Sequence, residues 1–248
     1  MRVELRDVSK GRKGRALPET SLSFETGEAI LAAAETEQRP TVLGLLASGR
    51  MRPDAGTITI DGEANRALMR RRIALVDAPD VSDPDSNVLF AGVVAEQLMF
   101  AGHHSNPVAA RRWLASYGMK ELATTPISDI PPEARLRALC ELAVLRSGVT
   151  GLVVVSPDRH GGHPLVWWRL AQDFASRDFA VLMIAGRASE WTIQHEHDIK
   201  EIGKSEGDLR ALGMLEERAG AWAQSGGTPL PEVEGHDRQS RKAIEGQS

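Results

Sequence analysis

The sequence has a single cysteine, no large excess of one charge and no long apolar run, and each absence narrows what the chain can be. One thiol, Cys140, cannot form an internal disulfide, which is typical of a reducing compartment. No segment approaches the roughly 20 apolar residues that span a bilayer, and the first residues lack an apolar stretch of signal-peptide length. We therefore expect a cytoplasmic chain that itself stays in water.

The balance of charges argues against a nucleic-acid partner. The 248 residues include 30 Lys and Arg against 34 Asp and Glu, which gives a net charge of -4 at pH 7. A protein that binds nucleic acid over its whole surface carries an excess of positive charge, and this composition has none. With 42% hydrophobic and 26% charged residues, the chain has the composition of a globular protein with a substantial core.

The spacing of apolar residues predicts an α/β protein. Alternation over residues 3–8 and 21–25 indicates an N-terminal pair of antiparallel strands. Bare apolar runs over residues 152–155 and 180–184 indicate parallel strands that are buried on both faces and joined by a crossover helix. Further predicted strands are residues 29–34, 56–62 and 72–76.

A long helical segment interrupts the strands. Residues 88–147 change to a helical period, which predicts an inserted helical subdomain with Cys140 as a buried thiol. In the crossover helix, we expect one of Trp167 and Trp168 in the core and the other partly exposed. The predicted helices are the stretch opened by Pro40 and residues 93–100, 107–117 and 133–146.

The carboxyl-terminal part of the chain differs in composition. Residues 208–222 have a helical period, whereas residues 224–248 are rich in glycine, proline and charge and have too little apolar surface to fold alone. We therefore predict one domain over residues 1–223, followed by a polar, disordered tail.

The order of these elements resembles the nucleotide-binding subunit of ATP-binding cassette (ABC) transporters, over roughly residues 1–220. Residues 45–62, which read LLASGRMRPDAGTITIDG, carry the most specific part of the resemblance, and residues 3–10 and 22–28 extend it. The resemblance implies a P-loop NTPase-like core with a mixed sheet, an N-terminal antiparallel β subdomain and an inserted helical subdomain. It also implies a membrane permease as partner, and a homodimer or a heterodimer with another ABC ATPase.

The phosphate-binding loop of that family is altered here. In the family, a glycine-rich loop cradles the phosphates with backbone N–H groups and ends in a lysine and a hydroxyl residue. The corresponding residues 33–41 contain no glycine, while Glu35 and Glu37 bring negative charge and Pro40 lacks an N–H group. The residues that could still contact an anion at this helix start, as a weak nucleotide site, are Gln38, Arg39 and Thr41.

The other motifs of the family are altered at their places as well. Residues 77–79, which read Asp-Ala-Pro, stand where the Q-loop glutamine is expected, and residues 130–134 stand in the place of the Leu-Ser-Gly-Gly-Gln signature. The Walker B strand ends in Ser156 and Pro157 instead of Asp-Glu, and residues 185–187 lack the switch histidine. We therefore expect no catalytic residue and no unaided ATP hydrolysis.

Two pairs of histidines have spacings that a metal could use. These pairs are His160 with His163 and His195 with His197, and neither has a cysteine partner or the i,i+4 spacing of a zinc protease. We expect all four in polar surface loops, and likewise Asp158, which follows the Walker B strand. No metal site is predicted.

Three functions fit the sequence. In the first, the chain is a structural or regulatory pseudo-ATPase that binds no cofactor and docks on a permease through residues 79–130, at the cytoplasmic face of the membrane. In the second, it is an authentic ABC ATP-binding protein that holds ATP and Mg²⁺ through a non-standard P-loop. In the third, it is a soluble protein-binding module that has left transport. Apolar residues near the implied docking region are Val88, Leu89 and Phe90.

Overall fold

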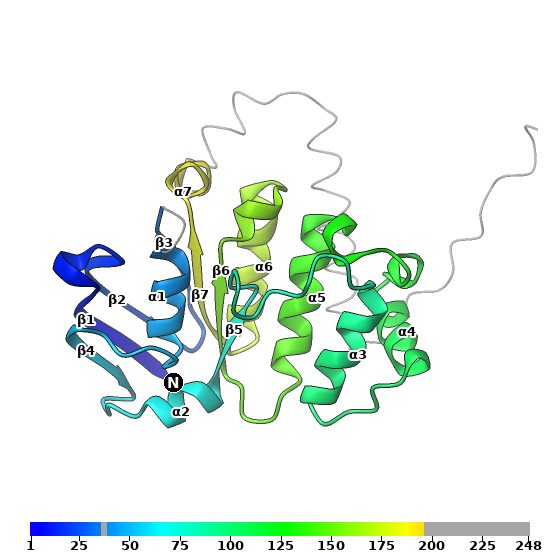
Figure 1. The fold of residues 1–248 in the computed structure, drawn as a ribbon, viewed down its shortest axis with the longest axis horizontal. Coiled ribbons are helices and arrows are strands. Elements are labelled where there is room, and N and C mark those ends of the chain that lie inside the picture. The colour runs from blue at the N-terminus through cyan, green and yellow to red at the C-terminus, as the bar shows by residue number, and fades with distance from the viewer. Residues whose placement is uncertain (36–38, 196–248) are drawn as a thin grey trace, which may run out of the picture. The chain divides into compact units, whose positions relative to one another are not determined.

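Two β-sheets organise residues 1–35 and 39–195, which the computed structural model describes (Figure 1). The first sheet is antiparallel, with the order β2-β1-β4, and the second is parallel, with the order β3-β7-β6-β5. The strands of the first sheet are β1 (Arg2–Lys10), β2 (Leu17–Glu25) and β4 (Ala55–Ile60). Those of the second are β3 (Ala29–Ala33), β5 (Ile73–Val76), β6 (Gly151–Val155) and β7 (Ala180–Ala185).

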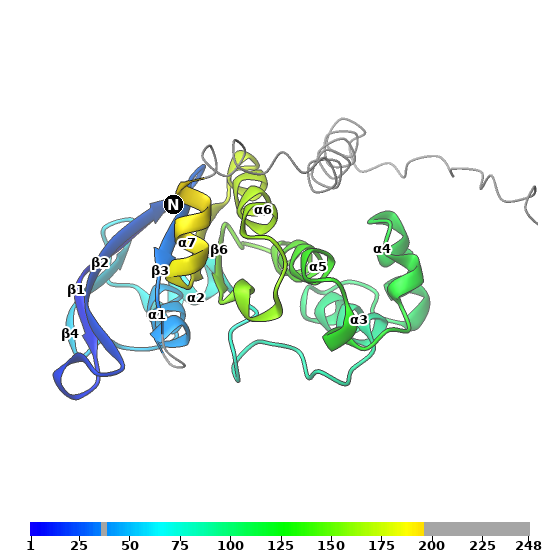
Figure 2. The same cartoon turned by 90° about the horizontal axis from the view of Figure 1, so that it is seen from above.

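Helices cover both faces of the parallel sheet. The helix α1 (Arg39–Ala47) packs on one face, and α5 (Pro132–Val144) and α6 (Pro164–Ser176) pack on the other. Every residue of β6 and β7 is buried, as expected of strands covered on both sides. Figure 2 shows the antiparallel sheet to one side of the parallel sheet, and the helices α3 to α5 to the other.

Alternation along β6 divides the apolar core into two clusters. Val153 and Val155 face α1 and the antiparallel sheet, whereas Leu152 and Val154 face α5 and α6. The approach of α1 is close, because a Cβ on Gly44 would lie 2.7 Å from Val155 Cγ2. The first cluster therefore joins the two sheets through α1, and the second joins the parallel sheet to the helical segment.

The helical segment contains the helices that the sequence predicts. Its main helices are α3 (Phe90–Phe100), α4 (Pro107–Ser116) and α5, and short 3-10 turns lie at η2 (Lys120–Leu122) and η3 (Ile127–Asp129). Cys140 is buried in α5, Trp167 is buried in α6 and Trp168 is half-buried, all as predicted. The mixed α/β architecture with an N-terminal antiparallel part is also confirmed.

The structure adds elements that the sequence did not predict. The helix α2 (Arg66–Arg72) begins where the Asn65 side chain accepts a hydrogen bond from Leu68 N at 2.9 Å, and α7 (Arg187–Gln194) follows β7. Single 3-10 turns occur at η1 (Arg12–Gly14) and η4 (Pro157–His160). The predicted helix over 208–222 and the tail over 224–248 lie outside the described residues, so the domain end at 223 stays a prediction.

Candidate functional site

The candidate site lies where the parallel strands end. Open parallel sheets bind ligands just beyond the carboxyl ends of their strands. Here the segment after β5 begins with Asp77, β6 leads into η4, and β7 leads through Gly186 into α7. These are the places to which the resemblance assigns the Q-loop, the Walker B acids and the switch histidine.

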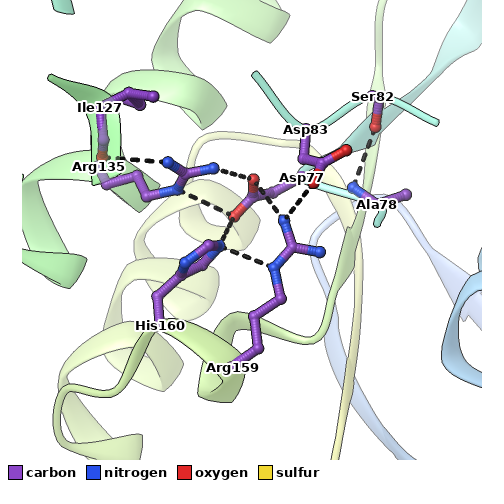
Figure 3. A network of polar contacts seen from close by, with 8 residues as sticks. All are labelled: Asp77, Ala78, Ser82, Asp83, Ile127, Arg135, Arg159 and His160. Atoms are coloured by element: carbon purple, nitrogen blue, oxygen red, sulfur yellow. Dashed lines mark hydrogen bonds and ion pairs between the residues drawn. The ribbon is translucent and has the colours of Figure 1, made fainter. Parts of the chain in front are cut away.

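A buried carboxylate, that of Asp77, is the centre of a polar network at this edge (Figure 3). Arg135, in the first turn of α5, donates from Nη2 to Asp77 Oδ1 at 2.7 Å and from Nε to Oδ2 at 3.4 Å. Arg159 of η4 donates from Nη2 to the same Oδ1 at 3.1 Å. One carboxylate therefore joins the end of β5 to α5 and to the segment after β6.

Further contacts complete the network. Arg135 Nη1 donates to the carbonyl of Ile127 at 3.2 Å, and Arg159 Nη2 reaches Asp83 Oδ2 at 3.3 Å. The Nε2 atom of His160 lies 2.9 Å from Asp77 Oδ2 and 2.8 Å from Arg159 Nε. A single ring nitrogen either donates to the carboxylate or accepts from the guanidinium, so the protonation of His160 decides which of the two bonds forms.

The electrostatics keep Asp77 charged in spite of its burial. Burial by itself raises the pKa of this carboxyl, but hydrogen bonds from His160 and Arg135, together with the charges of Arg135 and Arg159, lower the pKa to about 2. The backbone of Asp77 is left-handed, with φ of 56°, a conformation that costs about 1–2 kcal/mol outside glycine. The network fixes that conformation, because the carboxylate meets its partners from there.

Two other carboxylates occupy the beginning of α7. Asp158 Oδ2 accepts a hydrogen bond from Gly186 N at 2.9 Å, and Glu35 Oε1 accepts one from Arg187 N at 3.1 Å. N–H groups at a helix start are the donors that an anionic ligand takes. The predicted surface position of Asp158 is therefore wrong, because this half-buried residue ties the end of β6 to the end of β7.

The predicted anion-contacting residues lie at the start of α1. Arg39 and Thr41 are both half-buried in its first turn, and Gln38 and Glu37 lie outside the described residues. The Nε atom of Arg39 is buried and has no hydrogen-bond partner among residues 1–35 and 39–195. Among the described residues, no hydrogen bond connects Arg39 or Thr41 to the Asp77 network, so nucleotide binding by these residues stays a prediction.

Of the four histidines predicted in polar surface loops, His163 is an exposed loop residue as predicted, whereas His160 is not. His160 is part of the Asp77 network, and the His163 ring accepts a hydrogen bond from Leu165 N at 3.3 Å at the start of α6. His195 is half-buried and stacks on Trp191, whereas His197 lies outside the described residues. In the part of the chain that the structure describes, no three His, Cys, Asp or Glu side chains form a group that could hold a metal ion.

Comparison with known proteins identifies the fold. No model of a protein family matches the chain, and no curated protein matches it. Among solved structures, the chain is similar to a protein from Pyrococcus furiosus described as an ABC transporter ATP-binding protein, with 14% identity and a TM-score of 0.55 over 75% of this chain and 92% of that one. The chain has the fold of an ABC ATP-binding subunit.

Two further structures share the ABC ATP-binding fold. A nucleotide-free ATP-binding cassette from an ABC transporter has 12% identity and a TM-score of 0.52, over 75% of this chain and 82% of the other. A metal-chelate type ABC transporter in an inward-facing conformation has 14% identity and a TM-score of 0.52, over 74% and 72%. At such identities the likeness concerns the fold alone. In the described part of this chain, no helix combines the length and apolar character needed to cross a bilayer.

The Asp77 network could be predicted only in part from the sequence. The sequence placed Asp77 beyond a strand, in the position of the Q-loop glutamine, but it did not identify Arg135, Arg159 and His160 as its partners. An arginine in the first turn of a helix is ordinarily solvated. Only the structure shows that Arg135 contacts Asp77, which lies 58 positions earlier in the chain.

Replacing the central carboxylate tests the network. We expect Asp77→Asn to lower the free energy of unfolding by about 3–5 kcal/mol, because the substitution leaves the buried Arg135 without its counter-charge. Urea denaturation followed by tryptophan fluorescence measures the change. Asp80→Asn is the matched control, since Asp80 is exposed and also has a positive φ of 58°. An equal loss in both variants would contradict the assignment.

The low pKa of Asp77 predicts how stability depends on pH. Since the pKa is about 2 in the folded protein against 3.8 for the free group, this carboxylate stabilises the fold fully above pH 3.8 and loses its effect as the pH falls through 2. The stability gap between the wild type and Asp77→Asn should therefore shrink by about 2 kcal/mol between pH 5 and pH 2. A gap that stays constant across urea titrations in this range would contradict the prediction.

Proposed function

We propose that this chain is an ABC-type subunit that does not hydrolyse ATP and that serves as a structural or regulatory partner of a membrane permease, at the cytoplasmic face of the membrane. The observation that carries the proposal is the Asp77 network. It connects, within one chain, the three segments that correspond to the Q-loop, the signature helix and the Walker B strand. In a working ABC ATPase, these segments serve a nucleotide instead.

The residues at this edge do not fit ATP with Mg²⁺. Magnesium prefers carboxylate oxygens, but the Asp77 carboxylate already contacts two guanidinium groups and an imidazole. The carboxylates of Asp158 and Glu35 accept hydrogen bonds from N–H groups at the start of α7. Their negative charge therefore lies beside a potential phosphate position. The carboxylates of Asp77, Asp158 and Glu35 are therefore already occupied by partners within the chain.

The direction of the Arg135 side chain also argues against a contact between the start of α5 and a nucleotide. In the ABC family, the start of the signature helix faces the γ-phosphate held by the opposing subunit. Here that helix start begins with Pro131 and Pro132, which lack N–H donors, and Arg135 in the first turn points inward to Asp77. A positive charge held inside the same chain is not offered to a nucleotide across a dimer.

Exposed apolar residues support docking on a permease. Val88 is 40% exposed and Leu89 is 47% exposed, directly before α3, whereas Phe90 is fully buried and belongs to the core. The three residues that the sequence grouped together thus divide into a surface pair and a core residue. The surface pair lies within residues 79–130, the region that the resemblance assigns to the permease.

Titration with ATP tests the proposal. We expect the full chain to show no saturable heat with Mg-ATP at affinities tighter than about 100 μM, and no phosphate release above a blank without protein. The matched variant is Arg39→Ala. Saturable binding that this variant loses would overturn the proposal and favour an authentic ATP-binding subunit with an altered P-loop, because Arg39 stands in the lysine position and its Nε atom has no described partner.

Membrane fractionation tests the docking surface. In cells that express the chain with its native membrane proteins, we expect Val88→Asp with Leu89→Asp to move the chain from the membrane fraction to the supernatant. The control is Trp191→Asp, which changes a 56% exposed apolar residue of α7 that lies outside residues 79–130. A membrane fraction that is unchanged in the Val88 and Leu89 variant, or reduced equally in that variant and the control, would contradict docking through Val88 and Leu89.

A further inference from the structure

An arginine-lined hollow lies at the opposite end of the parallel sheet, near the amino ends of β5 and β6. Its volume is about 450 Å³. Arg70, Arg71 and Arg72 line it from the last turn of α2, and Arg146 lines it from the segment that follows α5. Figure 1 shows α2 and this segment at the lower end of the sheet, away from α7. Four arginine residues thus line one small space in a chain whose net charge is negative.

A fifth arginine lies behind the hollow. Arg50 is half-buried, and its guanidinium donates from Nη1 to the carbonyls of Ser48 and Ile73, both at 3.2 Å. Burial lowers the pKa of Arg50, and the positive charges of Arg146 and Arg70 lower it further. The arginines are therefore close enough to repel one another.

Backbone carbonyls hold several of these side chains in place. Arg70 Nη1 donates to the carbonyl of Gly49 at 3.2 Å, and Arg146 Nε donates to that of Ala143 at 3.4 Å. These bonds orient the side chains but leave their charge unmatched. The single described ion pair in the group joins Arg72 Nη1 to Asp61 Oδ2 at 3.8 Å. Across residues 1–35 and 39–195, Arg71 forms no ion pair or side-chain hydrogen bond.

We propose that this hollow binds a compact anion with several phosphate groups, such as a di- or triphosphate moiety, either free in solution or on a lipid headgroup. The planar fork of a guanidinium matches two phosphate oxygens at once, and several forks around one space match an anion with several charges. The volume lies within the range of small-molecule sites. Side chains fixed by carbonyls lose less conformational entropy on binding, which favours affinity.

The inference is independent of the proposed function. The hollow is at the amino ends of the strands, and the Asp77 network and Arg39 are at their carboxyl ends. Binding of ATP through its phosphates at the hollow would disappear in a variant of Arg71 and persist in Arg39→Ala. Binding at the P-loop position would show the reverse.

The first experiment uses inorganic tripolyphosphate as the probe. We expect saturable binding to the full chain by calorimetry at low salt, weakened about tenfold or more in Arg70→Gln with Arg71→Gln and weakened by added salt. The control pair is Arg111→Gln with Arg112→Gln, which removes the same charge from exposed positions of α4 and should change the affinity less than about twofold. The single variant Arg71→Gln accompanies the pair, since Arg71 has no described contact that folding would lose.

A second arm identifies the source of the phosphates. Vesicles of phosphatidylcholine, with and without a bisphosphorylated phosphoinositide, are sedimented with the same proteins. Binding to the phosphoinositide vesicles that only the Arg70 and Arg71 variants lose would assign a lipid headgroup, and binding to tripolyphosphate alone would assign a free phosphate. The proposal is overturned by an absence of saturable binding in both arms, or by equal weakening in the two variant pairs.

Discussion

The buried carboxylate of Asp77 is the interaction on which the arrangement of the helical segment and the sheet edge depends. Two guanidinium groups from segments 58 and 82 positions further along the chain contact one of its oxygens. A buried ion pair of this kind contributes little net stability compared with apolar packing, yet it is costly to break from one side. Its main effect is therefore specificity, because other placements of α5 relative to β5 would leave a charge buried without a partner.

The apolar core and the polar edge of the sheet have different structural roles. Alternation along β6 assigns one set of side chains to α1 and the other to α5 and α6, and this apolar packing forms the layers that the Asp77 network then holds in one arrangement. Beyond the strands, polar contacts take over. Asp77 contacts Arg135, Asp158 accepts a hydrogen bond from Gly186 N, and Glu35 accepts one from Arg187 N.

Sequence patterns predicted the fold well because the fold depends on them. Strands such as β6 and β7 are continuous apolar runs, and Pro107 and Pro132 stand at the beginnings of helices, so local chemistry was enough. The site was predicted less well, because its contacts are not local. The sequence predicts that Asp77 follows a strand, at the place that the resemblance gives to the Q-loop, but the pairing of Asp77 with Arg135 and the contact with His160 depend on side-chain directions that only the three-dimensional structure provides.

The capping of α7 has a consequence for any anion that approaches this edge. Glu35 and Asp158 belong to the same chain as the N–H groups that donate hydrogen bonds to them. Their carboxylates therefore compete with a free anion at an effective concentration of the order of millimolar or higher. A free anion at a lower concentration must displace a competitor that never diffuses away. The start of α7 therefore inhibits its own binding of anions, because both N–H groups already donate to carboxylates of the same chain.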